Sequence, residues 1–281
     1  MPLLNPATVT PTFAVVIPAY QSAATIEACL QSVAAQTVLP EQVVVVDDHS
    51  RDGTAAIAEG SRGPLASRGI ELQVIRQPAN GGPSRARNAG MAQTRTSHIA
   101  FLDADDIWHP NKLEVVRPHL GSGNDPALLY HAYTDESVFS VDTAQPPDYR
   151  AVRVRTRDLL VRNSAQTSCV VIRRDRGVRF EETLRYCEDY DLWLRIVEAR
   201  PVVRLIGPAL TRLGRPQLTQ GGLSGNRHRM RAGEMAAYLR FCSRRWFPRF
   251  ALLPALLAFS LLKHGTSGLR RIRRATDAPP G

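Results

Sequence analysis

The sequence predicts an α/β fold with a mostly parallel central sheet, helices on both faces of that sheet, and further helices towards the C-terminus. Strand-like and helix-like segments alternate through the first hundred residues. The strand-like segments are continuous apolar runs rich in β-branched residues, of which Val43–Val46 is the clearest. Strands that are buried on both faces have this composition, and they form parallel sheets that helices cover.

The expected elements of the first half are short strands and a helix. The strands are Phe13–Pro18, Val43–Val46, Leu72–Ile75 and Ile99–Leu102, and the helix is Thr25–Ala35. Apolar residues recur at helical spacing within Thr25–Ala35. Polar residues follow three of the strands, at Tyr20, Asp47–Asp48 and Asp103–Asp106. Because ligands bind beyond the carboxyl ends of parallel strands, these positions are the first candidates for a functional site.

The second half of the chain has a less regular pattern. Its expected strands are Ala127–Tyr130, Cys169–Ile172 and Val202–Ile206, and its expected helices are Glu188–Ala199, Arg227–Trp246 and Phe247–His264. Glycine and polar residues between Arg212 and Asn226 predict a loop.

The chain has 281 residues, and its charge is unevenly distributed. Residues 1–149 hold 9 basic and 16 acidic residues, whereas residues 150–281 hold 27 basic and 10 acidic residues. An acidic front half suits cations or neutral ligands, and an arginine-rich back half suits an anionic surface. The split argues against a uniformly basic coat that binds nucleic acid.

Cysteine usage and the terminal segments indicate a cellular location. The four cysteines have no CxxC pair and no zinc spacing, which indicates reduced thiols in a cytosolic protein. The N-terminal residues before Phe13 include no basic residue, so we expect no secretory signal. The apolar stretch Ala251–Leu262 has 12 residues and is too short to span a bilayer.

Asp103, Asp105 and Asp106 directly follow the expected strand Ile99–Leu102. Three carboxylates so close together repel one another unless a counter-charge lies between them. Mg²⁺ and Mn²⁺ prefer oxygen ligands, and Mg²⁺ often shares them with phosphate groups. The segment therefore predicts a divalent-metal site, and a solvated turn that caps a following helix is the alternative.

Two further segments carry polar groups that suit a ligand. Asp48 follows the valine strand and is able to accept hydrogen bonds from N–H or hydroxyl groups. Residues 80–88, NGGPSRARN, read as a loop in which glycines permit close backbone approach and Arg85 and Arg87 suit an anion. A simple turn explains either segment equally well.

Glu188, Asp189 and Asp191 open the expected helix Glu188–Ala199. The helix dipole favours acidic residues in a first turn, which is one explanation for them. A carboxylate near a bound diphosphate is also suited to general base catalysis. Trp108 and Trp193 fit either the hydrophobic core or a sugar-stacking role.

Taken in order, the segments FAVVIPAY, VVVVDDHSRDGT, NGGPSRARNAG, FLDADDIWHPNKLE and CEDYDLWLR resemble the motifs of family-2 glycosyltransferases. The resemblance covers about Phe13 to Arg212 and implies a GT-A fold. It also implies an inverting, metal-dependent transfer of a sugar from a nucleotide diphosphate, with a UDP-sugar favoured, to a hydroxyl of a glycan or lipid-linked acceptor. Polysaccharide biosynthesis for the cell envelope is the expected context.

The resemblance implies a role for each matching residue. The nucleotide-binding residues are Pro18, Ala19, Tyr20, Asp48, Asn80, Arg87, Asn88 and Asp103. By this resemblance, Tyr20 stacks on the base of the nucleotide, and the carboxylate of Asp48 recognises the edge of that base. Asp103 and Asp105 match the DxD pair that binds Mg²⁺ or Mn²⁺, with Asp105 the more direct ligand. Asp189 matches the catalytic base, and Glu188 supports it.

Two departures from the family pattern stand out. The QxxRW motif of processive members is incomplete, because Cys242 occupies the glutamine position before Arg245-Trp246. Many members also carry a histidine two residues after an arginine in the loop that follows the catalytic helix. Gly214 occupies that position here, which leaves Arg215 or His228 to contact the diphosphate.

We expect the chain to divide into five regions. Residues 1–12 are an N-terminal arm, 13–110 a nucleotide-sugar-binding half, 111–225 an acceptor and catalytic half, 226–274 a basic helical segment, and 275–281 a disordered tail. Arginines flank Ala251–Leu262 in a pattern typical of an interfacial anchor. We therefore expect a cytoplasmic protein held on the anionic inner face of the cell membrane. A helix that packs on the domain is the alternative.

Two other functions remain open at the level of sequence. The arginine-rich C-terminal region would suit a nucleic-acid-binding protein, but it leaves the acidic strand ends unexplained, so we expect no nucleic-acid partner. An aspartate-nucleophile phosphohydrolase would need a lysine between its nucleophile and a later acidic pair. Lys112 lies too close to Asp103 and Lys263 too far along the chain.

Overall fold

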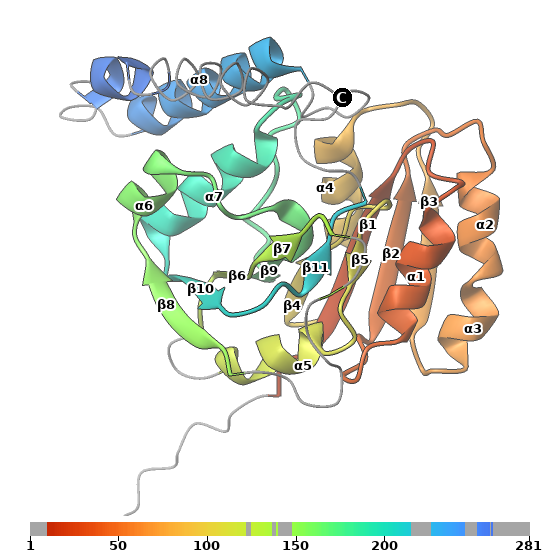
Figure 1. Cartoon of the computed structure of the whole chain (residues 1–281). Helices are drawn as coiled ribbons and strands as arrows, with labels where there is room; N and C mark the ends of the chain where they lie inside the picture. Colours follow the sequence, from red (N-terminus) through yellow and green to blue (C-terminus); the bar gives the residue numbers. More distant parts are fainter. Residues whose placement is uncertain are drawn as a thin grey trace, which may run out of the picture.

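A computed structural model describes residues 10–121, 125–136, 139, 148–214, 226–244, 252–258 and 260. One large sheet runs through the molecule, and helices lie against both of its faces (Figure 1). This arrangement confirms the α/β fold class that the sequence predicts.

The large sheet has eight strands in the order β3-β2-β1-β4-β9-β6-β10-β8. They are β1 (Phe13–Ala19), β2 (Gln42–Asp47), β3 (Glu71–Arg76), β4 (His98–Phe101), β6 (Leu128–Tyr130), β8 (Arg150–Val154), β9 (Val170–Arg173) and β10 (Val202–Ile206). Strands β3, β2, β1 and β4 are parallel, and β9 is antiparallel to both of its neighbours. Strands from both expected halves of the chain therefore share one sheet.

The helices are α1 (Ile26–Ala34), α2 (Thr54–Gly60), α3 (Arg62–Ala66), α4 (Pro83–Gln93), α5 (Lys112–Val116), α6 (Thr156–Val161), α7 (Glu188–Ala199) and α8 (Arg227–Ser243), with 3₁₀ turns η1 (Arg117–His119) and η2 (Thr167–Cys169). A second sheet joins β5 (Ile107–Trp108), β11 (Thr211–Arg212) and β7 (Tyr133–Thr134). This small sheet ties the segment after β10 to the segment after β4.

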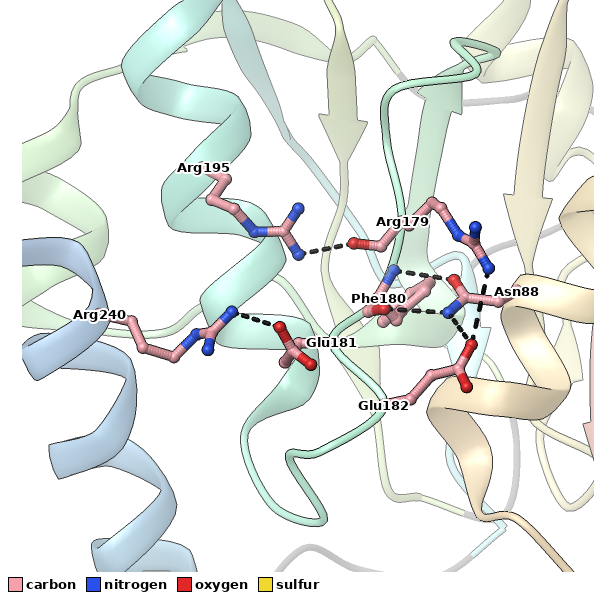
Figure 2. Close-up of a pocket in the computed structure, with 7 residues that line it drawn as sticks. All are labelled: Asn88, Arg179, Phe180, Glu181, Glu182, Arg195 and Arg240. Carbon is pink, nitrogen blue, oxygen red and sulfur yellow. Dashed lines mark hydrogen bonds and ion pairs between the residues drawn. The ribbon is translucent and has the colours of Figure 1, made fainter. Parts of the chain in front are cut away.

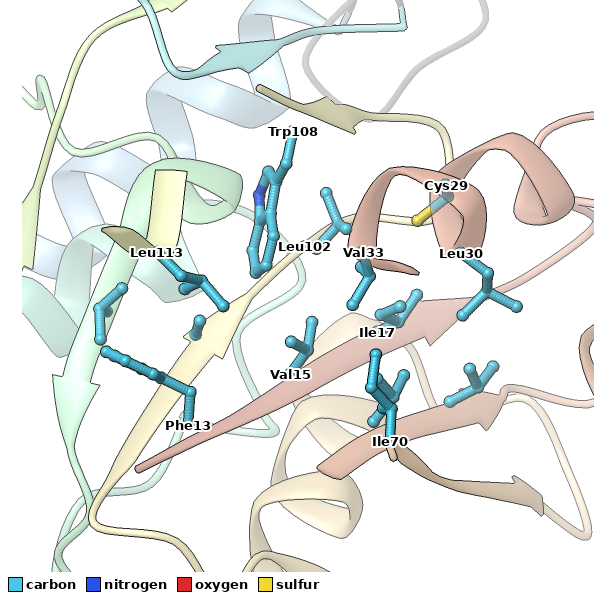
Figure 3. Close-up of a cluster of buried hydrophobic side chains, with 14 of the residues drawn as sticks. Phe13, Val15, Ile17, Cys29, Leu30, Val33, Ile70, Leu102, Trp108 and Leu113 are labelled. Carbon is cyan, nitrogen blue, oxygen red and sulfur yellow. The ribbon is translucent and has the colours of Figure 1, made fainter. Parts of the chain in front are cut away.

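The alternation of side chains along each strand builds a core on both faces of the sheet. Val15 and Ile17 of β1 pack with α1, α3 and α5 in the cluster that Figure 3 shows. Val16, between them, faces the other side, in a cluster with α6, α7 and α8. Strands that are apolar at every position are therefore buried on both faces, as the valine run predicts.

Helix α4 lies where the sequence predicts a loop. Gly82 precedes it with a φ of 84°, and Pro83 begins it, where the missing N–H costs no hydrogen bond. Gly90 brings the helix close to the sheet, because a Cβ there would lie 2.6 Å from Cγ1 of Val16. Arg87 and Asn88 therefore lie on a helix, and of residues 80–88 only 80–82 belong to the loop that connects β3 to α4.

The remaining differences concern the second half. Strand β8 pairs with β10 at the edge of the sheet, and its arginine-rich sequence RAVRV gave no strand pattern. Helix α8 begins at Arg227 as expected and ends at Ser243. Of the second expected C-terminal helix, residues 253–258 are helical, and the rest of Phe247–His264 lies almost entirely outside the described residues.

Candidate active site

The carboxyl ends of β1, β2 and β4 meet at one edge of the large sheet. Ala19 at the end of β1 is the register partner of Asp47 at the end of β2. The backbone N–H of Asp48 donates to Ala19 O at 2.8 Å, and that of Leu102, after β4, donates to Val16 O at 3.2 Å. Parallel pairing therefore brings the residues after each strand, including Tyr20, Asp48 and Asp103, to the same edge.

Tyr20 and its neighbours differ in exposure. Ala19 is buried and Pro18 half-buried, whereas Tyr20 is 53% exposed. A large aromatic side chain that is this exposed at the end of a parallel strand is free to stack on a planar ligand.

Asp48 organises the loop that precedes α4. Its two carboxylate oxygens accept hydrogen bonds from the backbone N–H groups of Gly81 and Gly82, at 2.8 and 2.7 Å. The side-chain amide of Asn80 donates to Asp48 O at 3.2 Å. Asp48 is buried, and these three hydrogen bonds hold residues 80–82 against the end of β2. Each carboxylate oxygen keeps further acceptor capacity, so contact with a base edge stays a prediction.

Arg87 joins the two acidic motifs. Its guanidinium donates to Oδ1 of Asp103 at 2.7 Å and to Oε1 of Glu188 at 2.9 Å. Burial by itself lowers the pKa of Arg87, but Asp103 and Glu188 raise it above its ordinary value, so the group stays charged. This buried cation brings segments that are 85 residues apart in the sequence to one place.

Asn88 points to a different side of α4 from Arg87. Its amide accepts from Phe180 N at 2.8 Å and donates to Phe180 O and to Oε1 of Glu182, both at 2.9 Å. It lines a cavity of about 460 Å³ between α4, α7 and α8 (Figure 2). Neighbouring residues on a helix point about 100° apart, and so the structure does not bring Asn88 to the carboxylate cluster.

The carboxylates of the segment after β4 separate into two environments. Asp103 and Asp105 keep part of their surface exposed. Asp106 is buried, where its carboxylate accepts from the Ser168 hydroxyl and, at 2.9 Å, from Gly214 N. Burial raises the pKa of Asp106 to about 7, and the nearby Asp103 contributes to the rise. Asp106 therefore stabilises the conformation of this loop, whereas Asp103 and Asp105 remain partly exposed.

Asp103 and Asp105 form a suitable pair for a Mg²⁺ or Mn²⁺ ion. Across the described part of the chain, no group of three or more His, Cys, Asp or Glu side chains is placed to hold a metal. Magnesium is usually bound by one or two carboxylates together with substrate phosphates. Two half-exposed carboxylates therefore fit an ion that is shared with a diphosphate.

Asp189 lies in the first turn of α7, beside Glu188. The residue before the helix, Cys187, has a left-handed backbone with a φ of 57°. Oδ1 of Asp189 accepts from Tyr190 N at 2.7 Å, and Oδ2 accepts from the Thr167 hydroxyl at 3.4 Å. The surrounding protein and Glu188 raise the pKa of Asp189 to about 7, against an opposing effect of Arg87. A half-buried carboxyl with this pKa is suited to take up a proton near neutral pH.

Gly214 explains the missing histidine of the family pattern. A Cβ at this position would lie 1.8 Å from the carbonyl oxygen of Asp105. The small sheet forces this approach, because Thr211 in β11 pairs with Trp108 in β5. Only glycine fits there. His228 is exposed at the start of α8, and Arg215 lies outside the described residues.

The two tryptophans belong to the hydrophobic core. Trp193 is fully buried, donates to Ala165 O at 3.0 Å and packs against Phe101 and Phe180. Trp108 is also buried and donates to Ser168 O at 2.9 Å. The sugar-stacking reading of these residues is therefore wrong, because neither ring reaches the surface.

The sequence does not mark Ser168 or Thr167 as functional residues, and it marks Gly214 only as a departure from the family pattern. Ser168 and Thr167 lie in η2, which contacts both acidic segments. No spacing pattern marks these residues, because they meet the motifs only through the tertiary fold.

No helix in the described part of the chain is long and apolar enough to cross a membrane.

Lys112 is completely buried, with its amine 3.4 Å from the centroid of the Trp108 ring. The lysine that a phosphohydrolase would need is therefore not available at the strand ends.

Comparisons with known proteins identify the family of the chain. A family model described as "Glycosyl transferase family 2" matches residues 14–177. The amylovoran biosynthesis glycosyltransferase AmsB of Erwinia amylovora is 28% identical over 193 residues, which cover 65% of this chain and 63% of AmsB. The chain spans less than two thirds of the length of the curated relatives that it matches first.

Solved structures share the fold. TarS 1-349 of S. aureus, in complex with UDP-GlcNAc, has a TM-score of 0.66 at 21% identity, over 91% of this chain and 73% of that one. The mannosyltransferase PcManGT of Pyrobaculum calidifontis, in complex with GDP-Man and Mn²⁺, has a TM-score of 0.61 at 17% identity, over 92% and 75%. The GT-A fold that the sequence predicts is confirmed.

Proposed function

The chain belongs to glycosyl transferase family 2, and we propose on this basis that it transfers a sugar from a nucleotide-diphosphate donor to an acceptor hydroxyl. The observation that supports this most is the ion-paired cluster in which Arg87 joins Asp103 to Glu188, beside Asp189. The cluster supports the proposal because Asp103 and the first turn of α7, which carries Asp189, lie together, and transfer requires a metal-binding carboxylate and a base to be close to each other.

The donor is a UDP-sugar in this proposal. Pro18, Ala19 and the exposed Tyr20 border the base, Asp48 accepts from its edge, and Asn80 closes the loop beside it. TarS, which shares the fold, has been solved with UDP and with UDP-GlcNAc. Arg87 acts on the diphosphate indirectly, through the charge it supplies to Asp103.

Asp103 and Asp105 hold Mg²⁺ or Mn²⁺ in this proposal. A bound ion would neutralise charge on the departing nucleoside diphosphate. PcManGT, which shares the fold, has been solved with Mn²⁺. Arg87 offsets the charge of Asp103 from the protein side, because the nearly buried guanidinium is ion-paired with the partly exposed carboxylate of Asp103.

Asp189 is the general base of an inverting, single-displacement reaction. It takes the proton of the acceptor hydroxyl, whose oxygen forms a bond to the anomeric carbon as the bond from that carbon to the diphosphate oxygen breaks. Attack comes from the face opposite the leaving group, and so the configuration inverts, by the logic of inverting glycosidases. Thr167 and the Tyr190 N–H orient the carboxylate, and Arg87 keeps Glu188 paired beside it.

The acceptor is a glycan or a lipid-linked sugar, and an anionic membrane surface is a further partner in this proposal. Supporting charge lies in β8, in α6 and at the two ends of α6, where the exposed arginines are Arg150, Arg153, Arg155, Arg157 and Arg162. Arg157 approaches Asp158 at 3.8 Å, and the other four form no ion pair with another described residue. Unpaired cations on one side of a protein attract anionic lipid headgroups.

Exposed aliphatic side chains accompany these arginines. Val161 in α6 is 57% exposed, Leu239 in α8 is 46% exposed, and Leu252 is 50% exposed. Helices α6 and α8 are in contact, since the Tyr238 hydroxyl donates to Leu160 O at 3.0 Å. Aliphatic tips among cations favour a lipid surface over a soluble polyanion. The cationic tail after Leu262, which the sequence reading assigned to the membrane, lies outside the described residues.

Replacement of the base tests the catalytic proposal. Asp189→Asn is expected to lower kcat by about 10²- to 10⁴-fold, because the amide does not accept the proton of the acceptor hydroxyl. Its affinity for UDP in the presence of Mn²⁺ should stay within about threefold of wild type by calorimetry, since Asp189 only faces the acceptor.

Asp175→Asn is the matched control, because Asp175 is partly exposed and pairs with Arg200 away from the cluster. The control should keep wild-type kcat. Full activity of Asp189→Asn would sink the assignment of the base, and loss of UDP affinity would give Asp189 a structural role.

A further inference from the structure

Ser168 makes two hydrogen bonds to the acidic loop through a single hydroxyl. Its Oγ accepts from the backbone N–H of Asp103 at 3.0 Å and donates to Oδ2 of Asp106. Ser168 is fully buried, so water does not compete for these bonds. Asp105 lies between the two residues that this hydroxyl holds.

The backbone of Ser168 is anchored as firmly as its side chain. Its carbonyl oxygen accepts from Nε1 of Trp108 at 2.9 Å, from Nζ of Lys112 at 2.9 Å and from the Thr211 hydroxyl at 3.1 Å. Trp108 and Lys112 follow the acidic loop, and Thr211 belongs to the strand that leads to Gly214. Ser168 is therefore fixed by the segments that enclose the loop on both sides.

The same turn also reaches the proposed base. The Thr167 hydroxyl donates to Oδ2 of Asp189 at 3.4 Å. One three-residue turn, η2, thus contacts the loop that carries Asp103 and Asp105 and the helix that carries Asp189. A displacement of η2 would change the distance between these two groups.

We propose that Ser168 is a positioning residue that holds the Asp103–Asp106 loop in the shape that binds the metal ion. The inference rests on the proposed function, in which Asp103 and Asp105 are the metal-binding carboxylates. Ser168 does not touch the ion itself. It fixes the backbone of Asp103 and the side chain of Asp106, so that the segment which carries both partly exposed carboxylates keeps its conformation.

Metal affinity tests this role without reference to turnover. The probe is Mn²⁺, titrated by calorimetry into the protein saturated with UDP. Ser168→Ala is expected to weaken Mn²⁺ binding by about 10- to 100-fold. This range is typical of residues that orient metal ligands without contacting the metal themselves. UDP affinity without metal should stay within about twofold of wild type.

Ser97→Ala is the matched control. The Ser97 hydroxyl also makes two backbone hydrogen bonds, to Thr12, but at the opposite end of the sheet from the loop. It should lower Tm without changing Mn²⁺ affinity. Ser168→Thr keeps the hydroxyl and is expected to restore most of the affinity that alanine loses.

If Ser168→Ala does not fold, Lys112→Met replaces it as the test. Methionine has a similar volume and removes one donor from the Ser168 carbonyl, so we expect Mn²⁺ affinity to fall several-fold. Wild-type Mn²⁺ affinity in whichever of these variants folds overturns the inference. Failure of the proposed function is a separate result, because Asp105→Ala would then bind Mn²⁺ as well as wild type does.

Discussion

Arg87 illustrates how far single residues were predictable. The motif NGGPSRARN marked it as a residue that contacts an anion, and the structure supplies the anions as Asp103 and Glu188 of the same chain. Removing one partner of such a buried pair costs about 3–5 kcal/mol, so Arg87 also contributes to stability. The carboxylates were predictable as a type, because they follow apolar strands and open a helix. Their shared partner was not, because the ion pairs connect distant segments.

The raised pKa of Asp189 predicts the pH dependence of activity. A base must be ionised to accept a proton, and burial with Glu188 raises the pKa of Asp189 to about 7. We expect kcat/KM to fall about tenfold per pH unit below about pH 7 and to be level above it. Initial rates from pH 5 to pH 9 at saturating metal provide the measurement. A profile that is level down to pH 5 would contradict the role of Asp189.

The same shift has a defined sign for stability. Native Asp189 keeps its proton to a higher pH than the unfolded chain, whose pKa is about 3.9. Its contribution to stability is therefore present below about pH 4 and is lost as the pH rises through about 7. Asp189→Asn removes this dependence. Urea unfolding should therefore show that the free energy of unfolding of the variant rises relative to that of wild type as the pH increases from 4 to 8. Asp106, which is unchanged in the variant, cancels in the comparison.

At the scale of elements, α7 is the helix on which the site depends, and α8 holds it in place. Asp191, one turn into α7 and fully buried, accepts from Arg195 of the same helix and from Arg240 and Arg244 of α8. A Cβ on Gly233 of α8 would lie 2.5 Å from Tyr186 O, directly before α7. The sequence predicts both helices, α7 from the apolar spacing of Leu192, Ile196 and Ala199. Their contact depends on charges whose pairing no local pattern records.

Asp191→Asn tests this contact. The neutral amide would leave three guanidinium groups without their shared carboxylate, although those groups are 25% to 38% exposed and partly hydrated. We expect a loss of about 3 kcal/mol in the free energy of unfolding and a fall in Tm of about 6–10 °C by calorimetry. Glu59→Gln, which breaks an exposed pair with Arg62, should change stability by less than about 0.5 kcal/mol. Equal stability of the two variants would show that α8 is held by apolar packing alone.

Across the whole molecule, the uneven charge of the sequence corresponds to exposed arginines that lie on one side of the protein. Strand β8 and helix α6 lie at one side of the sheet, on the left of Figure 1, whereas α2 and α3 lie at the opposite side. The exposed arginines of 150–162 therefore form a surface far from the exposed basic residues of the α3–β3 region. Arg87, Arg195 and Arg240, by contrast, are ion-paired inside the fold or between helices. Part of the positive charge thus stabilises the protein and part remains for an anionic surface.

Vesicle binding tests the membrane proposal. Arg153→Gln, Arg157→Gln and Arg162→Gln together should reduce co-sedimentation with vesicles of phosphatidylcholine and phosphatidylglycerol by about tenfold or more, since each cation contributes about 1 kcal/mol at an anionic surface. A variant with Arg68, Arg95 and Arg117 changed to glutamine removes the same charge elsewhere and should bind almost as wild type does. Equal loss in both variants would indicate an effect of net charge without a defined surface.

The fold class, the strands of the first half, helix α7 and the chemical types at the strand ends were all predictable from the amino-acid sequence. These features are encoded locally, in apolar runs, helical spacing and residues that directly follow a strand. The tertiary structure alone decided that NGGPSRARN begins helix α4, that Asn88 turns away from the carboxylates, and that Asp106 points inwards. It also decided that Gly214 lies against Asp105 and that Ser168 holds the acidic loop. Each of these features depends on contacts between residues far apart in the chain. Packing and burial in the folded protein determine which residues meet, and the local sequence pattern does not predict these partners.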